Sequence, residues 1–234
     1  MKLDIRHLTH TYDVDVINDL SLELEGYKSI ALIGVSGSGK STLLRILSGL
    51  EEATTGAVFM NGKPVSDAAY RKSIGFVFQH HNLFPHLTLK RNISLVLEQT
   101  RNKSKEEAES IALSQLAALR LEDQVDKLPK NVSGGQAQRA SLARALAMDP
   151  EIIFLDEPTS SLDPILTYEV LSAVEELRDS GKQFVFVTHV MNFVREFADY
   201  VIFMEEGNIV EQGPVSILET PKTTSLKEFM KKVR

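Results

Sequence analysis

The sequence contains no cysteine among its 234 residues. This absence excludes a disulfide framework and a thiolate metal site, and it fits a reducing compartment. Long apolar runs are also lacking, since runs such as 152–155 and 184–187 have strand length and fall far short of the ~18 residues that span a bilayer. The first residues contain no apolar core of a signal peptide. We therefore expect a cytosolic protein that reaches a membrane only through a partner.

An excess of positive charge is missing as well. The formal net charge is −6, so there is no global electrostatic case for nucleic-acid binding, and we expect no nucleic-acid partner. The sequence also has no internal repeat and no low-complexity tract. Its 43% hydrophobic and 25% charged residues are typical of a globular protein, and 234 residues suit one sizeable α/β domain.

Strand signals dominate the first third of the chain. Along residues 2–8, Leu3, Ile5 and His7 alternate with charged residues, which predicts these three side chains on one face of a strand. Leucines alternate with polar residues along 20–24 in the same way. Residues 57–60 end at an Asn-Gly dipeptide, which is typical of a hairpin turn. We expect further strands at 29–33, 74–78, 152–155, 183–187, 200–204 and 209–211.

Helical signals alternate with these strands. A helix is predicted after residue 39 with a stop near Gly49, and helices are expected at 164–179, at 190–197 and in the tail. Repeated strand–helix units indicate a mostly parallel sheet covered on both faces. The stretch from 88 to about 147 is predicted to be mostly helix, inserted into that sheet.

Residues 34–41 match the pattern G-x-x-x-x-G-K-[S/T] between a predicted strand and a predicted helix. The glycines let backbone N–H groups face phosphates, and the helix adds its positive N-terminal end. Lys40 would reach the β- and γ-phosphates, and Ser41 would supply a hydroxyl to Mg²⁺. A glycine-rich turn with an exposed lysine is the alternative, but the flanking strand and helix disfavour it. The candidate nucleotide contacts in this loop are Gly34, Ser36, Gly37, Ser38, Gly39, Lys40, Ser41 and Thr42.

Asp156 and Glu157 follow the apolar strand at 152–155. An acidic residue at the C-terminal end of a parallel strand lies at the crevice where ligands bind. Asp156 could hold Mg²⁺ through water, and Glu157 could accept a proton from an attacking water. The alternative is a solvated acidic pair before the turn at Pro158. The phosphate loop elsewhere in the chain favours the functional interpretation.

Between these two elements, residues 132–136 read VSGGQ and precede an alanine-rich helix at 137–147. Here the chain resembles the ATP-binding cassette (ABC) ATPases, whose hallmark is this signature, and the resemblance covers nearly the whole chain. It implies a P-loop NTPase (RecA-like) α/β core with a mixed sheet and an N-terminal antiparallel β subdomain. It also implies a helical subdomain inserted at about 85–147 within a single ATP-binding domain, 1–234.

The resemblance assigns roles to residues elsewhere in the chain. It implies that Tyr12 stacks on adenine with Val16 beside it, and that His189 contacts the γ-phosphate and orients water for Glu157. Gln79 matches a loop glutamine that joins Ser41 and Asp156 in the Mg²⁺ set, and residues 160–163 match the loop after the catalytic glutamate. Taken alone, Tyr12 is typical of a strand-end aromatic and His189 of a polar helix cap. The catalytic set implied is Glu157, His189, Lys40 and Gln79.

The family also implies a head-to-tail homodimer that binds ATP and Mg²⁺. Ser133 is predicted to be an N-cap, so its helix offers an anion site. Each ATP would lie between one Lys40 loop and the signature of the other copy, and hydrolysis would release the closed dimer. The contacts supplied across the dimer would be Ser133, Gly134, Gly135, Gln136 and Asp163.

Residues 78–88, 143–148 and 156–163 are similar to those of bacterial polar amino-acid importers. This likeness implies docking to an integral membrane permease at the cytoplasmic face of the cell membrane, and indirectly an extracytoplasmic solute-binding protein. Phe84, Leu87 and Leu89 are candidates for the permease contact, or else core residues of the helical insertion.

Other functions stay open at this stage. The chain could serve lipid, lipoprotein or drug export, and the direction of transport is not fixed by the sequence. A cassette protein of DNA repair or translation usually has two cassettes or a long coiled coil, and this chain has neither. The VSGGQ signature with His189 disfavours a P-loop kinase or partitioning ATPase. A transition-metal site at the histidines 80, 81 and 86 is disfavoured because cysteine is absent and the nearby carboxylates lack ligand spacing.

Overall fold

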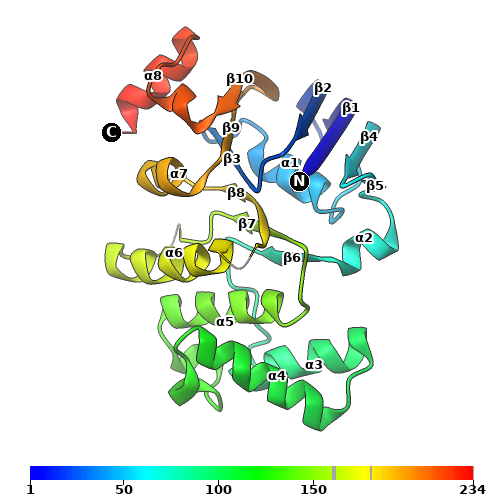
Figure 1. The fold of residues 1–234 in the computed structure, drawn as a ribbon, viewed down its shortest axis with the longest axis vertical. Helices are drawn as coiled ribbons and strands as arrows, with labels where there is room; N and C mark the ends of the chain where they lie inside the picture. Colours follow the sequence, from blue (N-terminus) through cyan, green and yellow to red (C-terminus); the bar gives the residue numbers. More distant parts are fainter. Residues whose placement is uncertain (160–161, 180, 234) are drawn as a thin grey trace. The chain divides into compact units, whose positions relative to one another are not determined.

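The computed structural model describes residues 1–159, 162–179 and 181–233. Internal contacts divide the chain into two compact units, shown with their elements in Figure 1. We call Met1–Lys72 with Gln183–Arg234 the first unit and Ser73–Lys182 the second unit. Over the described residues, none of the helices combines the length and the apolar character that crossing a bilayer requires.

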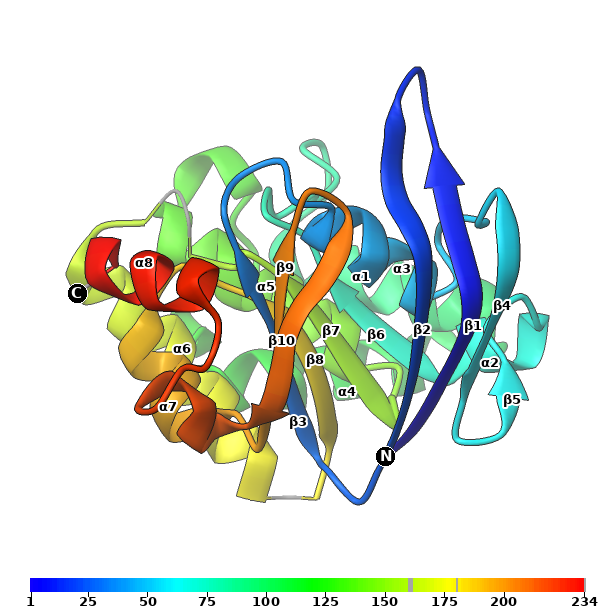
Figure 2. The same cartoon turned by 90° about the horizontal axis from the view of Figure 1, so that it is seen from above.

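A four-stranded antiparallel sheet opens the first unit, in the order β2-β1-β4-β5 (Figure 2). Leu20, Leu22 and Leu24 are buried, which confirms the predicted alternation. Asn61 and Gly62 have φ values of 50° and 77° and form the predicted hairpin turn between β4 and β5. The strands are β1 (Lys2–Thr11), β2 (Asp15–Glu25), β4 (Thr55–Met60) and β5 (Lys63–Pro64).

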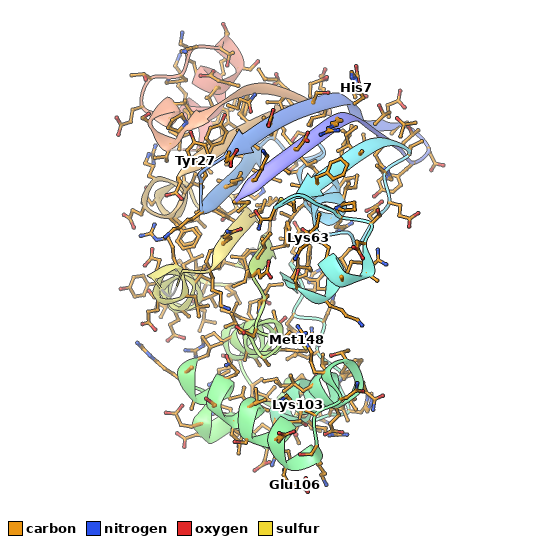
Figure 3. All side chains as sticks on the ribbon, turned by 45° about the vertical axis from the view of Figure 1, so that its right-hand side comes forward. His7, Tyr27, Lys63, Lys103, Glu106 and Met148 are labelled. Carbon is orange, nitrogen blue, oxygen red and sulfur yellow. The ribbon has the colours of Figure 1, made fainter. Side chains whose placement is uncertain are left out.

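One residue of β1 departs from the predicted alternation. His7 is exposed, and its side chain points away from the sheet in Figure 3, whereas Leu3 and Ile5 are buried. A φ of 48° at His7 and a register shift between Ile5 and Leu8 mark a β-bulge. The bulge moves the next buried position to Leu8, so the prediction for His7 is wrong.

The second group of strands in the first unit is centred on β3 (Ser29–Gly34), which is buried along its whole length. It pairs in parallel with β8 and with β9, and β10 runs antiparallel to β9. This arrangement confirms the expected mixed sheet. The neighbouring strands are β8 (Gln183–Val187), β9 (Tyr200–Glu205) and β10 (Asn208–Pro214).

Helix α1 (Lys40–Leu47) follows β3 and ends as predicted, with Gly49 at a φ of 70°. The short helix α2 (Ala68–Lys72) has no counterpart in the sequence prediction. Its Tyr70 hydroxyl donates a 2.7 Å hydrogen bond to the carbonyl of Leu47, which satisfies one of the last acceptors of α1. The remaining helices of the unit are α7 (Met191–Phe197), η3 (Val215–Leu218) and α8 (Thr224–Lys232).

The second unit contains a parallel strand pair, β6 (Ile74–Val77) and β7 (Ile152–Asp156), and a group of helices. In Figure 1, α5 lies between α6 and the pair formed by α3 and α4. The prediction of mostly helix over 88–147 is confirmed for these helices, although residues 119–133 contain only short 3-10 turns. The elements are α3 (Leu89–Arg101), α4 (Lys105–Ala118), η1 (Glu122–Gln124), η2 (Pro129–Asn131), α5 (Gly134–Leu146) and α6 (Pro164–Asp179).

Glu211 on β10 attaches the last helix, α8, to the first unit. Its carboxylate accepts hydrogen bonds from the backbone N–H groups of Lys222 and Thr223, at 2.9 and 2.8 Å, and from the Thr223 hydroxyl at 2.6 Å. Burial alone would raise the pKa of Glu211, but these hydrogen bonds outweigh it and the pKa is lowered. The buried face of α8 is formed by Leu226, Phe229 and Met230.

We predict that Glu211→Ala lowers the free energy of unfolding by about 1.5–3 kcal/mol, the range for hydrogen bonds to a charged group. Urea unfolding measures this loss, and Glu228→Ala on the exposed side of α8 is the control. Because the folded pKa is lowered, the stabilisation is present above the unfolded pKa of Glu211 and disappears as pH falls through the folded pKa. An equal stability of the two variants at pH 7 would contradict this role.

Candidate functional site

The phosphate loop, residues 34–39, joins β3 to α1 and packs against two backbone segments of the first unit. Gly34 has a φ of 147°, and a Cβ there would lie 2.1 Å from the carbonyl oxygen of Met204 on β9. Gly39 has a φ of 92°, and a Cβ there would lie 2.7 Å from the carbonyl oxygen of Val16 on β2. Both distances are shorter than real Cβ contacts, so only glycine fits at either end of the loop.

The N-terminus of α1 offers its backbone to a ligand. The N-cap residue Gly39 has no side chain to cap the helix, and the first turn contains no acidic residue. Ser36 and Gly37 are exposed, whereas Ser38 is buried. The first N–H groups of a helix have no intrahelical acceptor and carry the positive end of the helix dipole. The loop is therefore an anion site suited to a phosphate group.

Lys40 brings a buried positive charge to this loop. Its side chain is 5% exposed, and Nζ donates to the carbonyl oxygen of Val35 at 2.7 Å and to Ser38 Oγ at 3.3 Å. These two contacts hold the ammonium group at the loop, where a charged donor can make a strong charge-assisted hydrogen bond to an anion. Ser41 and Thr42 follow on the first turn of α1, half-buried and buried respectively.

His189 lies at the same sheet edge as the phosphate loop. Leu32 pairs with Val187 in the parallel β3–β8 ladder. Gly34 and His189 each lie two residues beyond this pair, and parallel strands end at one edge, where α/β sheets bind ligands. His189 is exposed there. The structure thus brings His189 and the loop to one edge of the first unit.

Tyr12 and Val16 flank the tip of the β1–β2 hairpin in the same unit. The Tyr12 side chain is 53% exposed, and its hydroxyl donates a hydrogen bond to Glu51. Val16 contacts the loop through the close approach of its carbonyl to Gly39. The first unit therefore contains the predicted contacts for the base and for the phosphates, together with His189.

Carboxylates gather at the end of β7 in the second unit. Asp156 is its last residue and is 2% exposed, and Glu157 follows, half-buried, with a φ of 45°. A left-handed backbone at a non-glycine residue costs energy and clusters at functional sites. Val77 pairs with Leu155 in the β6–β7 ladder, so Gln79 and Glu157 both lie two residues beyond it. The structure thus brings Gln79 to the edge where the two carboxylates lie.

Side chains of α5 fix the loop at residues 78–82, and the sequence analysis missed them. Gln138 Nε2 donates to the carbonyl oxygen of Phe78 at 3.0 Å, and Arg144 donates to that of Asn82 at 2.8 Å. Gln138 is only 3% exposed. Long polar residues on an alanine-rich helix are the one signal in the sequence that could have drawn attention to them.

The candidate permease contacts separate into two kinds. Asn92 on α3 is fully buried, and its side-chain amide bonds the backbone of Phe84 in both directions, at 2.7 and 3.1 Å. Phe84 is 42% exposed, whereas Leu89 is fully buried and Leu87 is half-buried. Leu89 is therefore a core residue, which is one of the two interpretations that the sequence left open, while Phe84 is exposed on a loop whose backbone Asn92 binds.

Burial, and then the positive charge of Arg144, lower the pKa of His81 in this loop. Within the described part of the chain, no group of three His, Asp or Glu side chains is arranged to hold a metal ion. The loop is thus organised by its backbone hydrogen bonds with α5 and α3.

The signature begins α5 in the predicted way. Ser133 is the N-cap, and its hydroxyl accepts from the N–H of Gln136 at 3.2 Å. The Gln136 side chain accepts from the N–H of Ser133 at 3.0 Å, which completes a capping box. Ser133 and Gly134 are exposed. A Cβ at Gly135 would lie 2.9 Å from the Leu166 side chain, so glycine permits the close packing of α5 on α6.

Asp163 caps the neighbouring helix, α6. Its Oδ1 accepts hydrogen bonds from the N–H groups of Ile165 and Leu166, at 2.9 and 3.0 Å. The two serines of the same predicted loop, Ser160 and Ser161, lie outside the described residues. The second unit therefore contains Gln79, the signature, both carboxylates and Asp163.

Comparison with known proteins extends these observations to the whole chain. Residues 17–160 match the family model described as ABC transporter. The chain is 43% identical over 227 residues to the glutamate transport ATP-binding protein GluA of Corynebacterium glutamicum, covering 94% of each chain. It is 39% identical over 230 residues to the glutamine transport ATP-binding protein GlnQ of Bacillus subtilis, covering 96% of this chain and 95% of the relative.

The fold has solved counterparts. The ATP-binding cassette MJ0796, solved as a dimer in a post-hydrolysis state bound to ADP and Pi, superposes with a TM-score of 0.82 at 32% identity. That match covers 91% of this chain and 98% of the cassette. The expected P-loop NTPase fold is thereby confirmed.

We predict that Gly39→Ala loses nucleotide binding and that Gly37→Ala is the milder change. Gly37 has a φ of 80°, and a Cβ there meets nothing within 4 Å. Both substitutions incur the left-handed backbone cost of about 1–2 kcal/mol. Only Gly39→Ala adds the clash with Val16, which costs about 1–3 kcal/mol more. Thermal unfolding and ATP titration of both variants check this, and equal effects would contradict the close approach of Val16.

Proposed function

The chain belongs to the ABC transporter family and is an ATPase of that family, and we propose that it energises the uptake of an amino acid through a membrane permease. The observation that carries this proposal is its 43% and 39% identity, over at least 94% of the chain, to glutamate and glutamine transport ATP-binding proteins. The phosphate loop and the strained carboxylate edge supply the chemistry for ATP hydrolysis. We treat 1–234 as one ATP-binding domain, with the helical part at about 85–147.

ATP binds, in this proposal, with its phosphates on the loop 34–39 and on the first turn of α1. Lys40 donates to phosphate oxygens, and Ser36 to Thr42 surround the phosphate chain with N–H and hydroxyl donors. The adenine stacks on the exposed ring of Tyr12, next to Val16. Binding energy is thereby spread over both ends of the nucleotide.

The oxygen donors of the site fit Mg²⁺, which prefers carboxylate, hydroxyl and amide oxygens. Asp156 is a buried carboxylate at a strand end, Ser41 places a hydroxyl on the first turn of α1, and Gln79 lies at the carboxylate edge. These three residues would hold the ion, with Asp156 acting through water. Bound Mg²⁺ would neutralise charge on the phosphate oxygens.

Glu157 is proposed to be the general base. Glu157 has a left-handed backbone directly after the buried Asp156, and it lies as far beyond the β6–β7 ladder as Gln79 does. The attacking water would pass its proton to Glu157, while the exposed side chain of His189 orients this water and contacts the γ-phosphate.

A second copy of the chain is proposed to complete each nucleotide site in a head-to-tail homodimer. Ser133 and Gly134 are exposed at the N-terminus of α5, where helix N–H groups favour an anion. With Gly135, Gln136 and Asp163, they would contact the γ-phosphate bound by the partner. The structure of MJ0796 as a dimer with ADP and Pi supports this arrangement.

The remaining partners are a permease, at the cytoplasmic face of the membrane, and indirectly an extracytoplasmic solute-binding protein. Phe84 and the loop held by Asn92 form the proposed permease contact. Reconstitution with the permease in liposomes tests the whole proposal, with ATPase stimulation measured against a panel of amino acids. Stimulation by an acidic amino acid or its amide is expected, and stimulation only by lipids, drugs or nucleic acid would reject it.

We predict that Glu157→Gln retains ATP binding but lowers kcat about 10²- to 10⁴-fold, the range for loss of a general base. The variant should accumulate an ATP-bound dimer, because hydrolysis is the step that opens it. Size-exclusion chromatography with ATP and a phosphate-release assay measure both effects. Glu151→Gln, at an exposed position before β7, is the control. Near-normal turnover by Glu157→Gln would remove this residue from the base role.

We also predict that Ser133→Arg abolishes ATP-dependent dimerisation while the monomer still binds ATP. Ser104→Arg is a matched control, because Ser104 caps α4 through the same kind of capping box, with Glu107. Both variants lose a helix cap, at about 0.5–2 kcal/mol. Only Ser133→Arg places a bulky side chain at the proposed site of the partner's phosphate. Normal dimerisation of Ser133→Arg in the presence of ATP would refute the contact across the dimer.

A further inference from the structure

Three side chains meet beneath the tip of the β1–β2 hairpin in the first unit. His10 lies on β1 and Tyr12 follows its last residue, and their ring centroids are 4.6 Å apart with planes at 86°. Glu51, in the loop after α1, accepts a hydrogen bond from the Tyr12 hydroxyl through Oε1. His10 Nε2 lies 3.0 Å from the same oxygen. The carboxylate of Glu51 is thus shared between the two aromatic rings.

The two contacts of Glu51 differ in kind. His10 is 6% exposed, and within the described structure neither of its ring nitrogens has a partner in hydrogen-bond geometry, so its approach to Glu51 is close but not directed. The directed hydrogen bond goes to Tyr12. Burial, and then the bond to Glu51, raise the pKa of the Tyr12 hydroxyl, which therefore remains a donor at neutral pH. Glu51 fixes one end of the Tyr12 ring, and His10 supports the ring itself.

Glu51 also connects this ring to the helix that carries the phosphate site. The backbone N–H groups of Leu50 and Glu51 both donate to the carbonyl of Arg45 on α1, at 3.0 and 3.3 Å. The position of Glu51 is therefore set by the C-terminal end of α1, whose N-terminal end follows the phosphate loop. Glu51 therefore connects the hydroxyl of Tyr12, at the hairpin tip, to the C-terminal end of α1.

We propose that Glu51 and His10 are positioning residues that fix the Tyr12 ring for the adenine base, and so raise the affinity for ATP without touching the nucleotide. The inference rests on the proposed stacking role of Tyr12. More than half of the Tyr12 side chain stays exposed, which leaves ring surface for the base. A ring that is already held loses less freedom when ATP binds, so its stacking contributes more to affinity.

The surroundings of Glu51 allow a clean test. The loop that carries it borders a cavity of about 320 Å³, which is also lined by its exposed neighbour Glu52. Truncation of Glu51 therefore enlarges an existing space and does not open a packed core. Glu52→Ala removes the same charge from the same loop and serves as the matched control.

The decisive experiment is a double-mutant cycle on the purified full chain, with ATP affinity and steady-state hydrolysis as readouts. Tyr12→Phe and Glu51→Ala should each raise the Kd and KM for ATP about three- to tenfold, the change that matches the typical net contribution of one hydrogen bond. The kcat of Glu51→Ala should be unchanged, and the double variant should be no worse than either single variant. Glu51→Gln should restore most of the affinity, because its amide oxygen still accepts the Tyr12 hydrogen bond.

His10 is tested by a pair of substitutions. His10→Ala should raise the KM for ATP, and His10→Phe should restore it, because a phenyl ring keeps the edge-to-face contact with Tyr12. A His10→Phe variant as weak as His10→Ala would remove the ring contact from the proposal. Thermal unfolding of each variant separates a loss of affinity from a loss of fold.

Tyr12→Ala distinguishes the positioning role from the stacking role. If Tyr12→Ala binds ATP normally, the assignment of Tyr12 to the base is wrong and the proposed site itself must be revised. If Tyr12→Ala is weakened while Tyr12→Phe and Glu51→Ala bind normally, the stacking stands and the positioning proposal is overturned. Additive losses in the cycle, or an equal loss in Glu52→Ala, would overturn it as well.

Discussion

The structure depends on the close approach of backbone to backbone at the phosphate loop. Gly34 and Gly39 let the carbonyls of Met204 and Val16 lie where any side chain would place its Cβ. This contact sets the curvature of the loop, and the loop in turn presents the uncapped first turn of α1. Lys40, whose ammonium group donates to the Val35 carbonyl and to Ser38, adds a buried positive charge to the same loop.

The edge of the second unit where Asp156 and Glu157 lie is built by a different constraint. Parallel pairing of β6 with β7 places Gln79 and Glu157 at equivalent positions, and the backbone at Glu157 adopts a left-handed conformation directly after the buried Asp156. This conformation leaves Glu157 partly exposed to water, whereas its neighbour Asp156 is buried. The register of the β6–β7 pair and the backbone conformation at Glu157 therefore determine where Asp156 and Glu157 lie.

Features governed by local rules could be read from the sequence. The cap at Ser133, the stop at Gly49 and the turn at Asn61 follow from residue type and spacing, and the order of the family motifs predicts the site residues. Features that arise from tertiary contacts could not be read in this way. The bulge at His7 and the burial of Leu89 depend on partners distant in sequence, and Gln138 and Arg144 gain their role only because the loop at 78–82 folds against α5.

Helix α5 carries a mechanical consequence. Its N-terminus is the signature, and its thirteen residues form a helix about 20 Å long. Two of its side chains donate hydrogen bonds to the backbone at the two ends of the loop at 78–82. The capping box stiffens the first turn of this helix, and Gly135 seats it closely on α6. A shift of α5 along its axis would therefore move Ser133 together with the side chains that bind Phe78 and Asn82.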